Sequence, residues 1–280
     1  MASQRRMLRT ATATVAAGTT AVCTAVIVGA APAAGAQVLP APASVQAAAP
    51  SPSPDPFEKL TADQIGDRAV TATQSATSLR MTGRVESDGQ PLDIDLAVND
   101  KRECTGRMTI GGGTAELRQA DGITYMKGDE RFWRVSMTSQ GIPEPQIGPT
   151  IELLKGRWLK ITPGQAGSGD LSGVCDLKEL LADLDKEEGE RRGLTRGPDA
   201  EVEGTPVATL VKKRPGGETT TVSVSQEGKP YILKMVKTGG EEPGTIVFSD
   251  YDKPVKVVVP PPDETVDLTK LDQGATTGAV

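Results

Sequence analysis

The sequence predicts an α+β fold in which antiparallel β-meanders form a sheet and helices cover one of its faces. Three observations support this prediction. Two long stretches alternate apolar and polar residues in short runs between turn residues, which is typical of antiparallel strands with one buried face. Helix-capping patterns precede the first of these stretches and lie between the two. A curved sheet must bury its apolar face, so the helical insert between the meanders is its expected cover.

The first predicted folded element is a helix. Thr61 can cap its start, and Gln64, three residues later, can complete a capping box. Its predicted apolar face consists of Ile65, Ala69, Ala72 and Ala76.

The first meander is predicted from strict alternation along the chain. Asp88-Gly89, Asn99-Asp100 and Asp121-Gly122 are turn signals, and the three glycines from Gly111 to Gly113 indicate a hairpin turn. The predicted strands cover residues 79–85, 92–98, 104–110, 115–119 and 123–126.

The segment between the meanders is predicted to be mainly helices and loops. Asp129 to Met137 is expected to form a short helix, and Gly141 to Pro149 a loop rich in proline and glycine. Apolar residues between Ile151 and Leu159 add bulk. Asp176 can cap a further helix whose apolar face is formed by Leu177, Leu180, Leu181 and Leu184.

Alternation returns in the second meander. Gly- and Pro-rich turns separate its predicted strands, and Pro260-Pro261-Pro262 is expected to end the sheet. These strands cover about 206–212, 219–226, 231–238, 244–249 and 255–259.

The N-terminus predicts export. Arginines between Arg5 and Arg9 precede an apolar stretch over residues 11–31, and Ala34-Gly35-Ala36 offers a small-x-small cleavage site. Together these features define a secretory signal peptide. A transmembrane anchor is the alternative interpretation, but the stretch is only weakly apolar and no stop-transfer charges follow it.

The domain organisation follows from these boundaries. Residues 1–36 are the predicted signal peptide, and 37–56, mostly Ala, Pro and Ser, a disordered linker. Residues 57–269 are expected to form the folded domain, and 270–280 a flexible tail.

The composition argues against several kinds of function. The chain carries a net charge of −6, which disfavours binding to nucleic acid or to anionic membrane surfaces. It contains no histidine, and so lacks the usual general base and the commonest metal ligand. We therefore expect a protein that is not an enzyme and that has no metal and no cofactor.

The cysteines predict a disulfide. Cys23 lies in the signal peptide, which leaves Cys104 and Cys175 as an even number in an oxidising compartment. Such a bond would stabilise the fold by about 4 kcal/mol on the chain-entropy model. Two unpaired buried thiols are the alternative.

Four residues are the strongest candidates for site chemistry. Asp93 and Asp95 are paired carboxylates, but alternation places both on the polar face of one strand, where they most simply aid solubility. A cation site or a glycosidase pair is the alternative. Trp133 and Trp158 could hold a sugar or lipid, or could belong to the core.

From about Phe57 to Leu268 the sequence resembles the LppX/LprAFG lipoprotein family. The segments that carry the resemblance are Met81–Val85, Leu92–Asn99, Glu103–Gly106, Ala115–Leu117, Tyr125–Lys127, Phe132-Trp133, Gly228–Tyr231, Gly244–Tyr251 and Pro254-Val255. The family is similar in fold to the LolA/LolB lipoprotein carriers. The resemblance implies a half-open antiparallel β-barrel of about 10–11 strands, with helices covering its concave face.

The resemblance also implies a function in the cell envelope, as a binder and carrier of lipid or lipoglycan acyl chains in an apolar cavity between sheet and helices. The alternative is a non-catalytic sensing or protein-interaction module with a filled core, whose partners are envelope proteins. The implied cavity lining comprises Met81, Val85, Ile94, Leu96, Met108 and Leu117 from the strands, and Phe132, Trp133, Leu154 and Trp158 from the lid.

Lipidation distinguishes this chain from that family. Family members are commonly lipidated on a cysteine just after the signal peptide, whereas Cys23 follows Thr20-Ala21-Val22 and precedes more apolar sequence. That is a poor lipidation site. We therefore expect a secreted, extracytoplasmic protein with no stable membrane anchor after cleavage.

Overall fold

The computed structural model describes residues 55–87, 89–164, 173–186, 192–240 and 242–267. The chain divides into two units between Pro52 and Ser53, and every described residue belongs to the second. The predicted signal peptide, the predicted linker up to residue 54 and the predicted tail lie outside the described residues. None of the helices in the described part of the chain has both the length and the apolar character needed to cross a bilayer.

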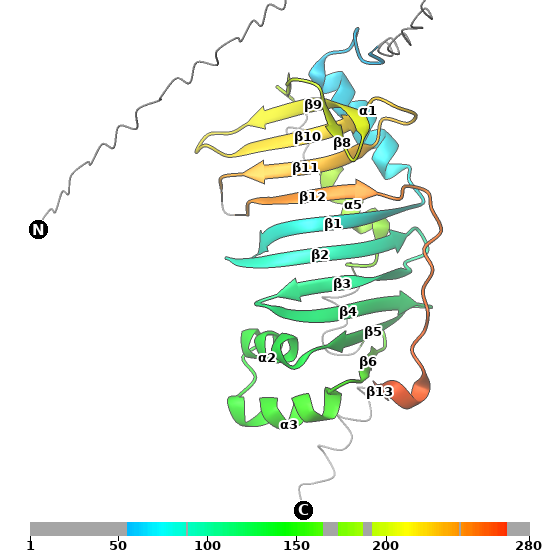
Figure 1. Cartoon of the computed structure of the whole chain (residues 1–280), viewed down its shortest axis with the longest axis vertical. Coiled ribbons are helices and arrows are strands. Elements are labelled where there is room, and N and C mark those ends of the chain that lie inside the picture. The colour runs from blue at the N-terminus through cyan, green and yellow to red at the C-terminus, as the bar shows by residue number, and fades with distance from the viewer. Residues whose placement is uncertain (1–54, 88, 165–172, 187–191, 241, 268–280) are drawn as a thin grey trace, which may run out of the picture. The chain divides into compact units, whose positions relative to one another are not determined.

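One large sheet forms the framework of the described residues (Figure 1). It has 13 strands, more than expected, in the order β13-β6-β5-β4-β3-β2-β1-β12-β11-β10-β9-β7, with β8 also paired to β9. Neighbouring strands are antiparallel except β13 and β6, which are parallel. The strands are β1 (Ser78–Ser87), β2 (Gln90–Asn99), β3 (Cys104–Ile110), β4 (Gly113–Ala120), β5 (Ile123–Gly128), β6 (Trp158–Ile161), β7 (Thr195–Arg196), β8 (Ala200–Val202), β9 (Thr205–Lys213), β10 (Thr219–Ser225), β11 (Ile232–Thr238), β12 (Gly244–Ser249) and β13 (Thr265–Asp267).

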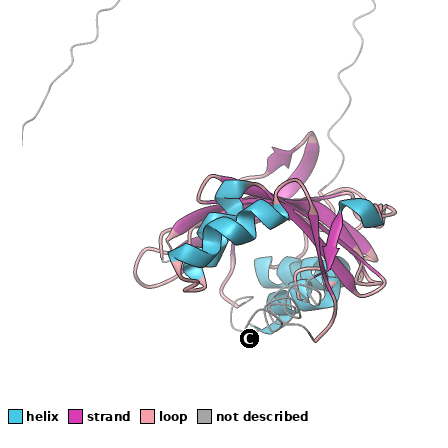
Figure 2. Cartoon of the chain, turned by 90° about the horizontal axis from the view of Figure 1, so that it is seen from below, coloured by secondary structure: helices cyan, strands magenta, loops and turns pink. Residues whose placement is uncertain are grey.

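The sheet is curved and does not close on itself, and helices lie on its inner side (Figure 2). The described helices are α1 (Ala62–Gln74), α2 (Glu130–Ser139), α3 (Glu144–Leu154), α5 (Leu177–Lys186) and a 3₁₀ turn (Pro262–Glu264). The predicted α+β class, a half-open antiparallel barrel with helices on its concave face, is therefore confirmed.

The predicted helix starts follow from side-chain capping. At α1, Thr61 Oγ1 accepts a hydrogen bond from Gln64 N (3.2 Å) and Gln64 Oε1 accepts one from Thr61 N (2.9 Å), which completes the predicted capping box. At α5, Asp176 accepts hydrogen bonds from the backbone of Lys178 and Glu179. Local sequence is sufficient to specify both starts because cap and helix are adjacent in the chain.

One predicted loop is instead a helix. The sequence pattern predicts an irregular segment from Gly141 to Pro149, but α3 begins at Glu144 within it. Pro145 lies in the first turn, where a missing backbone N–H loses no helical hydrogen bond. Proline therefore marks the start of this helix, and the prediction of a loop through Pro149 is wrong.

One predicted strand is also wrong. Residues 255–259 are extended but form no ladder. The chain instead continues along the sheet to β13, which pairs with β6 more than a hundred residues earlier in the sequence. Local alternation cannot predict such a pairing, because the partner strand is distant along the chain.

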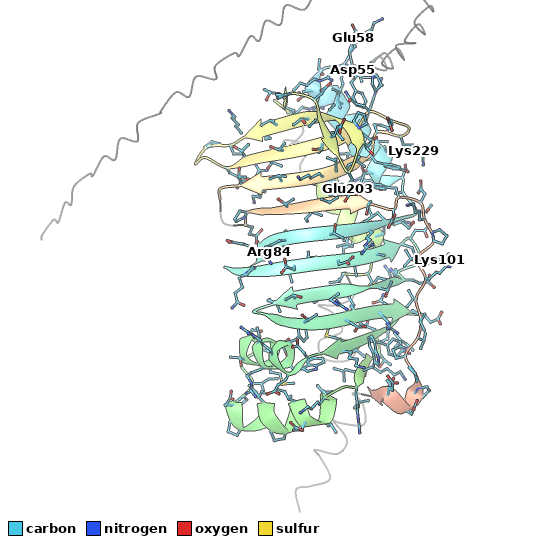
Figure 3. The ribbon with its side chains drawn as sticks, viewed as in Figure 1. Asp55, Glu58, Arg84, Lys101, Glu203 and Lys229 are labelled. Carbon is cyan, nitrogen blue, oxygen red and sulfur yellow. A yellow bond between two sulfur atoms is a disulfide. The ribbon has the colours of Figure 1, made fainter. Side chains whose placement is uncertain are left out.

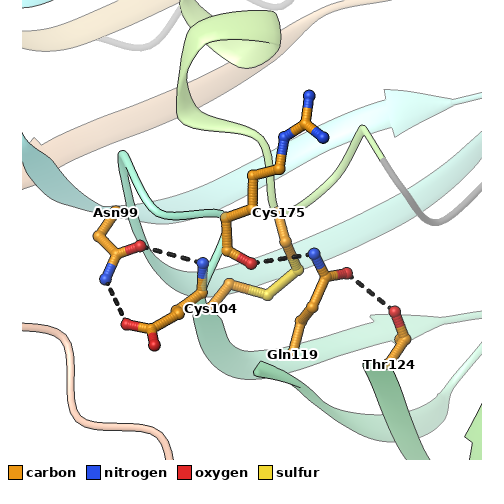
Figure 4. The surroundings of a disulfide bond; sticks show 7 residues. Asn99, Cys104, Gln119, Thr124 and Cys175 are labelled. Carbon is orange, nitrogen blue, oxygen red and sulfur yellow. Dashed lines mark hydrogen bonds between the residues drawn. A yellow bond between two sulfur atoms is a disulfide. The ribbon is translucent and has the colours of Figure 1, made fainter. Parts of the chain in front are cut away.

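The predicted disulfide between Cys104 and Cys175 is present (Figure 4), with a Cα–Cα distance of 5.3 Å. Both cysteines are fully buried. Beside them, the Gln119 side-chain amide donates to the Arg102 carbonyl (2.9 Å), and Thr124 Oγ1 donates to Gln119 Oε1 (2.8 Å). The bond fastens the segment before α5 to the start of β3.

Candidate functional site

A hollow of about 370 Å³ lies on the concave side of the sheet, in the half formed by β1 and β9–β12. The helices α1 and α5 and the segment at Leu194 border it from the other side. Its lining residues are Gly66, Ala69, Val70, Val85, Leu184, Leu194, Leu210, Lys212, Arg214, Thr220, Val222, Ile232, Met235, Val236, Lys237, Glu242, Gly244 and Ile246.

Side-chain size explains why the hollow lies in this half. Over β4 and β5, the helix α2 presents Phe132 and Trp133 to positions without side chains. A β-carbon on Gly128 would lie 2.5 Å from Phe132 and 2.9 Å from Trp133, so the bulky rings fill that half. Over β10 and β11, the helix α1 presents the small residue Ala69, and space remains open above the sheet.

The hollow changes from apolar to charged along the strands. Leu210, Val222, Met235 and Ile246 form its apolar part, whereas Lys212, Arg214, Lys237 and Glu242 lie near the ends of β9 and β11. Figure 1 shows that β9 and β11 end at the edge of the sheet where β10 and β12 begin. The charged groups therefore gather at one end of the hollow.

The structure places the predicted lining residues differently from one another. Val85 lines the hollow. Met81, Ile94 and Met108 are partly buried and pack against the core. The remaining inward residues are buried in that core: Leu96, Leu117, Phe132, Trp133 and Leu154.

Trp158, the last predicted lid residue, lies on the other face of the sheet. Its neighbour Leu159 is paired with Met126 and belongs to the core, so alternation directs Trp158 away from the core. The guanidinium carbon of Arg118 lies 4.2 Å from the centre of the indole ring, and Arg118 Nη1 donates to the Val258 carbonyl (2.8 Å). Arg118, stacked on Trp158, thus bonds the extended segment around Val258 to the outer face.

Most of the lining comes from the second meander and was not among the predicted lining residues. Most of its apolar members occupy inward positions of β9 to β12, and alternation predicts that such positions share one face. Two lysines also indicate the hollow in the sequence. Lys212 and Lys237 lie near strand ends, two residues from the apolar residues Leu210 and Met235, so alternation places them on the same face. Lysine at an inward position indicates a polar opening.

Asp93 and Asp95 lie on the outer face, as alternation predicts, and each binds one arginine. Arg84 bonds Asp93 at 2.6 and 2.7 Å, and Arg80 bonds Asp95 at 2.7 and 2.8 Å. The hydrogen bonds from Arg84 and Arg80 lower the pKa values of the two carboxyls. A glycosidase general acid needs a raised pKa, so this arrangement does not suit that chemistry.

Arg118 and Glu116 form a further ion pair on the outer face. Arg84 and Lys101 lie at opposite ends of the strands (Figure 3). A polar crevice of about 460 Å³ on this face is lined by Arg80, Asp95, Ala97, Thr105, Gly106, Arg107, Glu116 and Asp250. No group of three or more Cys, Asp or Glu side chains within the described residues is placed to hold a metal ion.

Comparisons with known proteins show similarity at the level of the fold. No protein-family model and no curated protein matches the sequence. LprF from Mycobacterium bovis is 13% identical, with 71% of this chain and 96% of that chain covered and a TM-score of 0.49. LppX from Mycobacterium tuberculosis is 15% identical, with 70% and 97% covered and a TM-score of 0.45. MucB in the Pseudomonas aeruginosa MucA/MucB complex is 13% identical, with 72% and 59% covered and a TM-score of 0.33. The chain is thus similar in fold to the LprF and LppX lipoproteins, as its sequence segments suggested.

Proposed function

We propose that this protein binds an acyl chain of a lipid or lipoglycan in the hollow between α1, α5 and the second meander, and that it acts as a carrier rather than an enzyme. The observation that supports the proposal is the apolar hollow on the concave side, lined by residues such as Leu210, Val222 and Ile246.

Desolvation would provide the binding energy. Each methylene moved from water into an apolar lining contributes about 0.8 kcal/mol. The hollow measures about 370 Å³, within the range of roughly 300–1,000 Å³ typical of small-molecule sites. An acyl chain is the ligand that best fits such a lining. It has no polar groups, so it needs no hydrogen-bond partner from the apolar residues.

A protein-interaction module would need a different surface. Such a module with a filled core would expose a contiguous apolar patch. Within the described residues, the large apolar side chains that are well exposed are Leu153, Val258 and Val259. The hollow therefore favours a lipid ligand over a protein partner.

We further propose that the protein works outside the cytoplasm. The sequence pattern of the first 36 residues supports export. The disulfide between Cys104 and Cys175 supports the same location, because such bonds persist in oxidising compartments.

A matched pair of substitutions tests the proposal. Val222 lines the hollow on β10, whereas Val247 on β12 alternates with the lining residue Ile246 and therefore faces outward. Val222→Phe should fill the hollow, and Val247→Phe should leave it unchanged. Protein purified from the native host would be examined by native mass spectrometry and by organic extraction.

We expect the unmodified protein and Val247→Phe to retain lipid and Val222→Phe to lose it. Folding of each variant would be checked by circular dichroism and thermal unfolding. Absence of acyl chains from the unmodified protein, together with no uptake from vesicles, would contradict the proposal. A carrier must also deliver its cargo, so we expect transfer of labelled lipid between vesicles to accelerate with the unmodified protein and not with Val222→Phe.

A further inference from the structure

We propose that the ligand is an amphiphile with one acyl chain and an anionic head, such as a fatty acid or a lysophospholipid. This inference rests on the proposed function and specifies its ligand class. The head would contact Lys212 and Lys237 at the charged end of the hollow, and the chain would follow the apolar part along the strands.

The register of three neighbouring strands brings two lysines and a threonine together. Thr220 on β10 pairs with Lys212 on β9 and with Lys237 on β11, so the three residues form one row across the sheet. All three line the hollow. Strands lie about 4.8 Å apart, so the row presents two ammonium groups on either side of a hydroxyl. A carboxylate or phosphate placed over Thr220 could accept hydrogen bonds from all three side chains.

The row next to these three residues is apolar. Two residues deeper along the same strands lies the row Leu210, Val222 and Met235, which is wholly apolar. Two residues along a strand span about 7 Å. The row with the two lysines could therefore contact the anionic head of an amphiphile, and the apolar row could contact the start of its chain.

The lysine and arginine side chains at this end also contact neighbouring groups of the protein. Glu218 forms ion pairs with both Arg214 and Lys237, the latter at 3.6 Å. The ammonium of Lys212 donates to the Arg192 carbonyl. Glu242 is the remaining charged lining residue. Lys212, Arg214 and Lys237 thus provide cationic groups at this end, and each of them also contacts other groups of the protein.

The volume of the hollow bears on the number of acyl chains. The hollow of about 370 Å³ lies near the lower limit of roughly 300 Å³ for small-molecule pockets. This volume favours one chain over the two or three of a complex lipid.

The experiment uses lipid-stripped protein and five probes that share palmitoyl chains. They are palmitate, lysophosphatidylglycerol, zwitterionic lysophosphatidylcholine, neutral monopalmitoylglycerol and two-chain dipalmitoylphosphatidylglycerol. Binding would be measured by equilibrium dialysis below micelle-forming concentrations. Palmitate and lysophosphatidylglycerol distinguish a carboxylate from a phosphate head. We expect both to bind more tightly than the neutral and zwitterionic probes, and more weakly as salt is raised.

Two variants test the residues. In Lys212→Gln/Lys237→Gln we expect the affinity for the anionic probes to fall on the order of tenfold, because two partly exposed ammonium groups would no longer pair with the head. Affinity for monopalmitoylglycerol should not change. The control is Lys234→Gln, on the same strand but paired with the outward-facing Val247, which should bind all probes normally.

The outcomes separate this inference from the proposed function. Equal affinity for anionic and neutral single-chain probes, or tighter binding of the two-chain lipid, would overturn the inference and leave lipid binding intact. No binding of any probe would overturn both.

Discussion

Leu194 occupies the space next to Gly66, on the wall of the hollow. Leu194 Cδ1 lies 2.8 Å from the position that a β-carbon on Gly66 would take. One turn earlier in α1, Asp63 accepts hydrogen bonds from the backbone of Gly193 (3.3 Å) and Leu194 (2.9 Å). The absence of a side chain at Gly66 therefore lets a distant segment pack onto α1 beside the hollow.

Gly66→Ala should reduce ligand affinity with little effect on stability. Alanine improves helix propensity by about 1 kcal/mol, which offsets the cost of moving the tip of Leu194. The displaced leucine would occupy part of the hollow, since both residues line it. Affinity for an acyl chain and urea unfolding would be measured together.

Gly148→Ala provides the matched control. Gly148 is also helical, in α3, but a β-carbon added there would meet no neighbouring side chain or strand within 4 Å, and the residue is not part of the hollow. We expect this change to leave affinity unchanged. Because Pro149 follows and disfavours a helical conformation of a preceding residue that carries a β-carbon, no gain in the free energy of unfolding is expected. Equal affinity in both variants would contradict the role of Gly66.

Reduction of the bond between Cys104 and Cys175 should lower both stability and affinity. The sequence separation of 71 residues predicts a loss of about 4 kcal/mol on the chain-entropy model. Leu184 of α5 lines the hollow, so release of the segment before α5 should also weaken binding. Urea unfolding with and without dithiothreitol tests this.

The double variant Cys104→Ala/Cys175→Ala is the control for that measurement. It should resemble the reduced protein and should not respond to dithiothreitol. A reductant that changes neither stability nor affinity of the unmodified protein would exclude a structural role for the bond.

Arg118→Met should destabilise the fold without affecting the ligand. The change removes the cation over Trp158 and the hydrogen bond to the Val258 carbonyl, but keeps an apolar stem. We expect a loss of about 1–2 kcal/mol in thermal or urea unfolding. Acyl-chain affinity should be unchanged, because this contact lies on the outer face. A fall in affinity would place Trp158 in the ligand site.

Asp252 should make stability depend on acidity. Hydrogen bonds from the Tyr231 hydroxyl (2.6 Å), the Thr77 backbone (2.9 Å) and Lys229 (3.1 Å) lower its pKa. A lowered pKa in the folded state adds stability above the unfolded value of about 3.9, and this stability is lost as pH falls below it.

Asp252→Asn should therefore reduce the free energy of unfolding at pH 7, and this difference should shrink steadily as the pH falls below about 3.9. The carboxylate is 36% exposed, so solvent screening limits the expected loss to about 1 kcal/mol. Asn tolerates the positive φ of 59° at this position. Asp121→Asn, also at positive φ, is the control. A difference that is constant with pH would show that the carboxylate charge is not responsible.

Much of the fold was predictable because the relevant interactions are local. Thr61 and Gln64 specify the start of α1, and alternation assigns Asp93 and Asp95 to the outer face, where Arg84 and Arg80 bind them. The candidate site was less predictable. Val85 was found in the lining of the hollow, whereas Phe132 and Trp133 fill the other half of the barrel.

Capping and alternation act between near neighbours, so the fold class, the cysteine pair and the residues of each strand that share a face could be predicted from the sequence. The position of the hollow could not. It depends on how closely α1 packs over β10 and β11, which lie more than 140 residues later in the chain. An empty volume depends on the fit between the helices and the sheet, and the sequence of neither one specifies it alone.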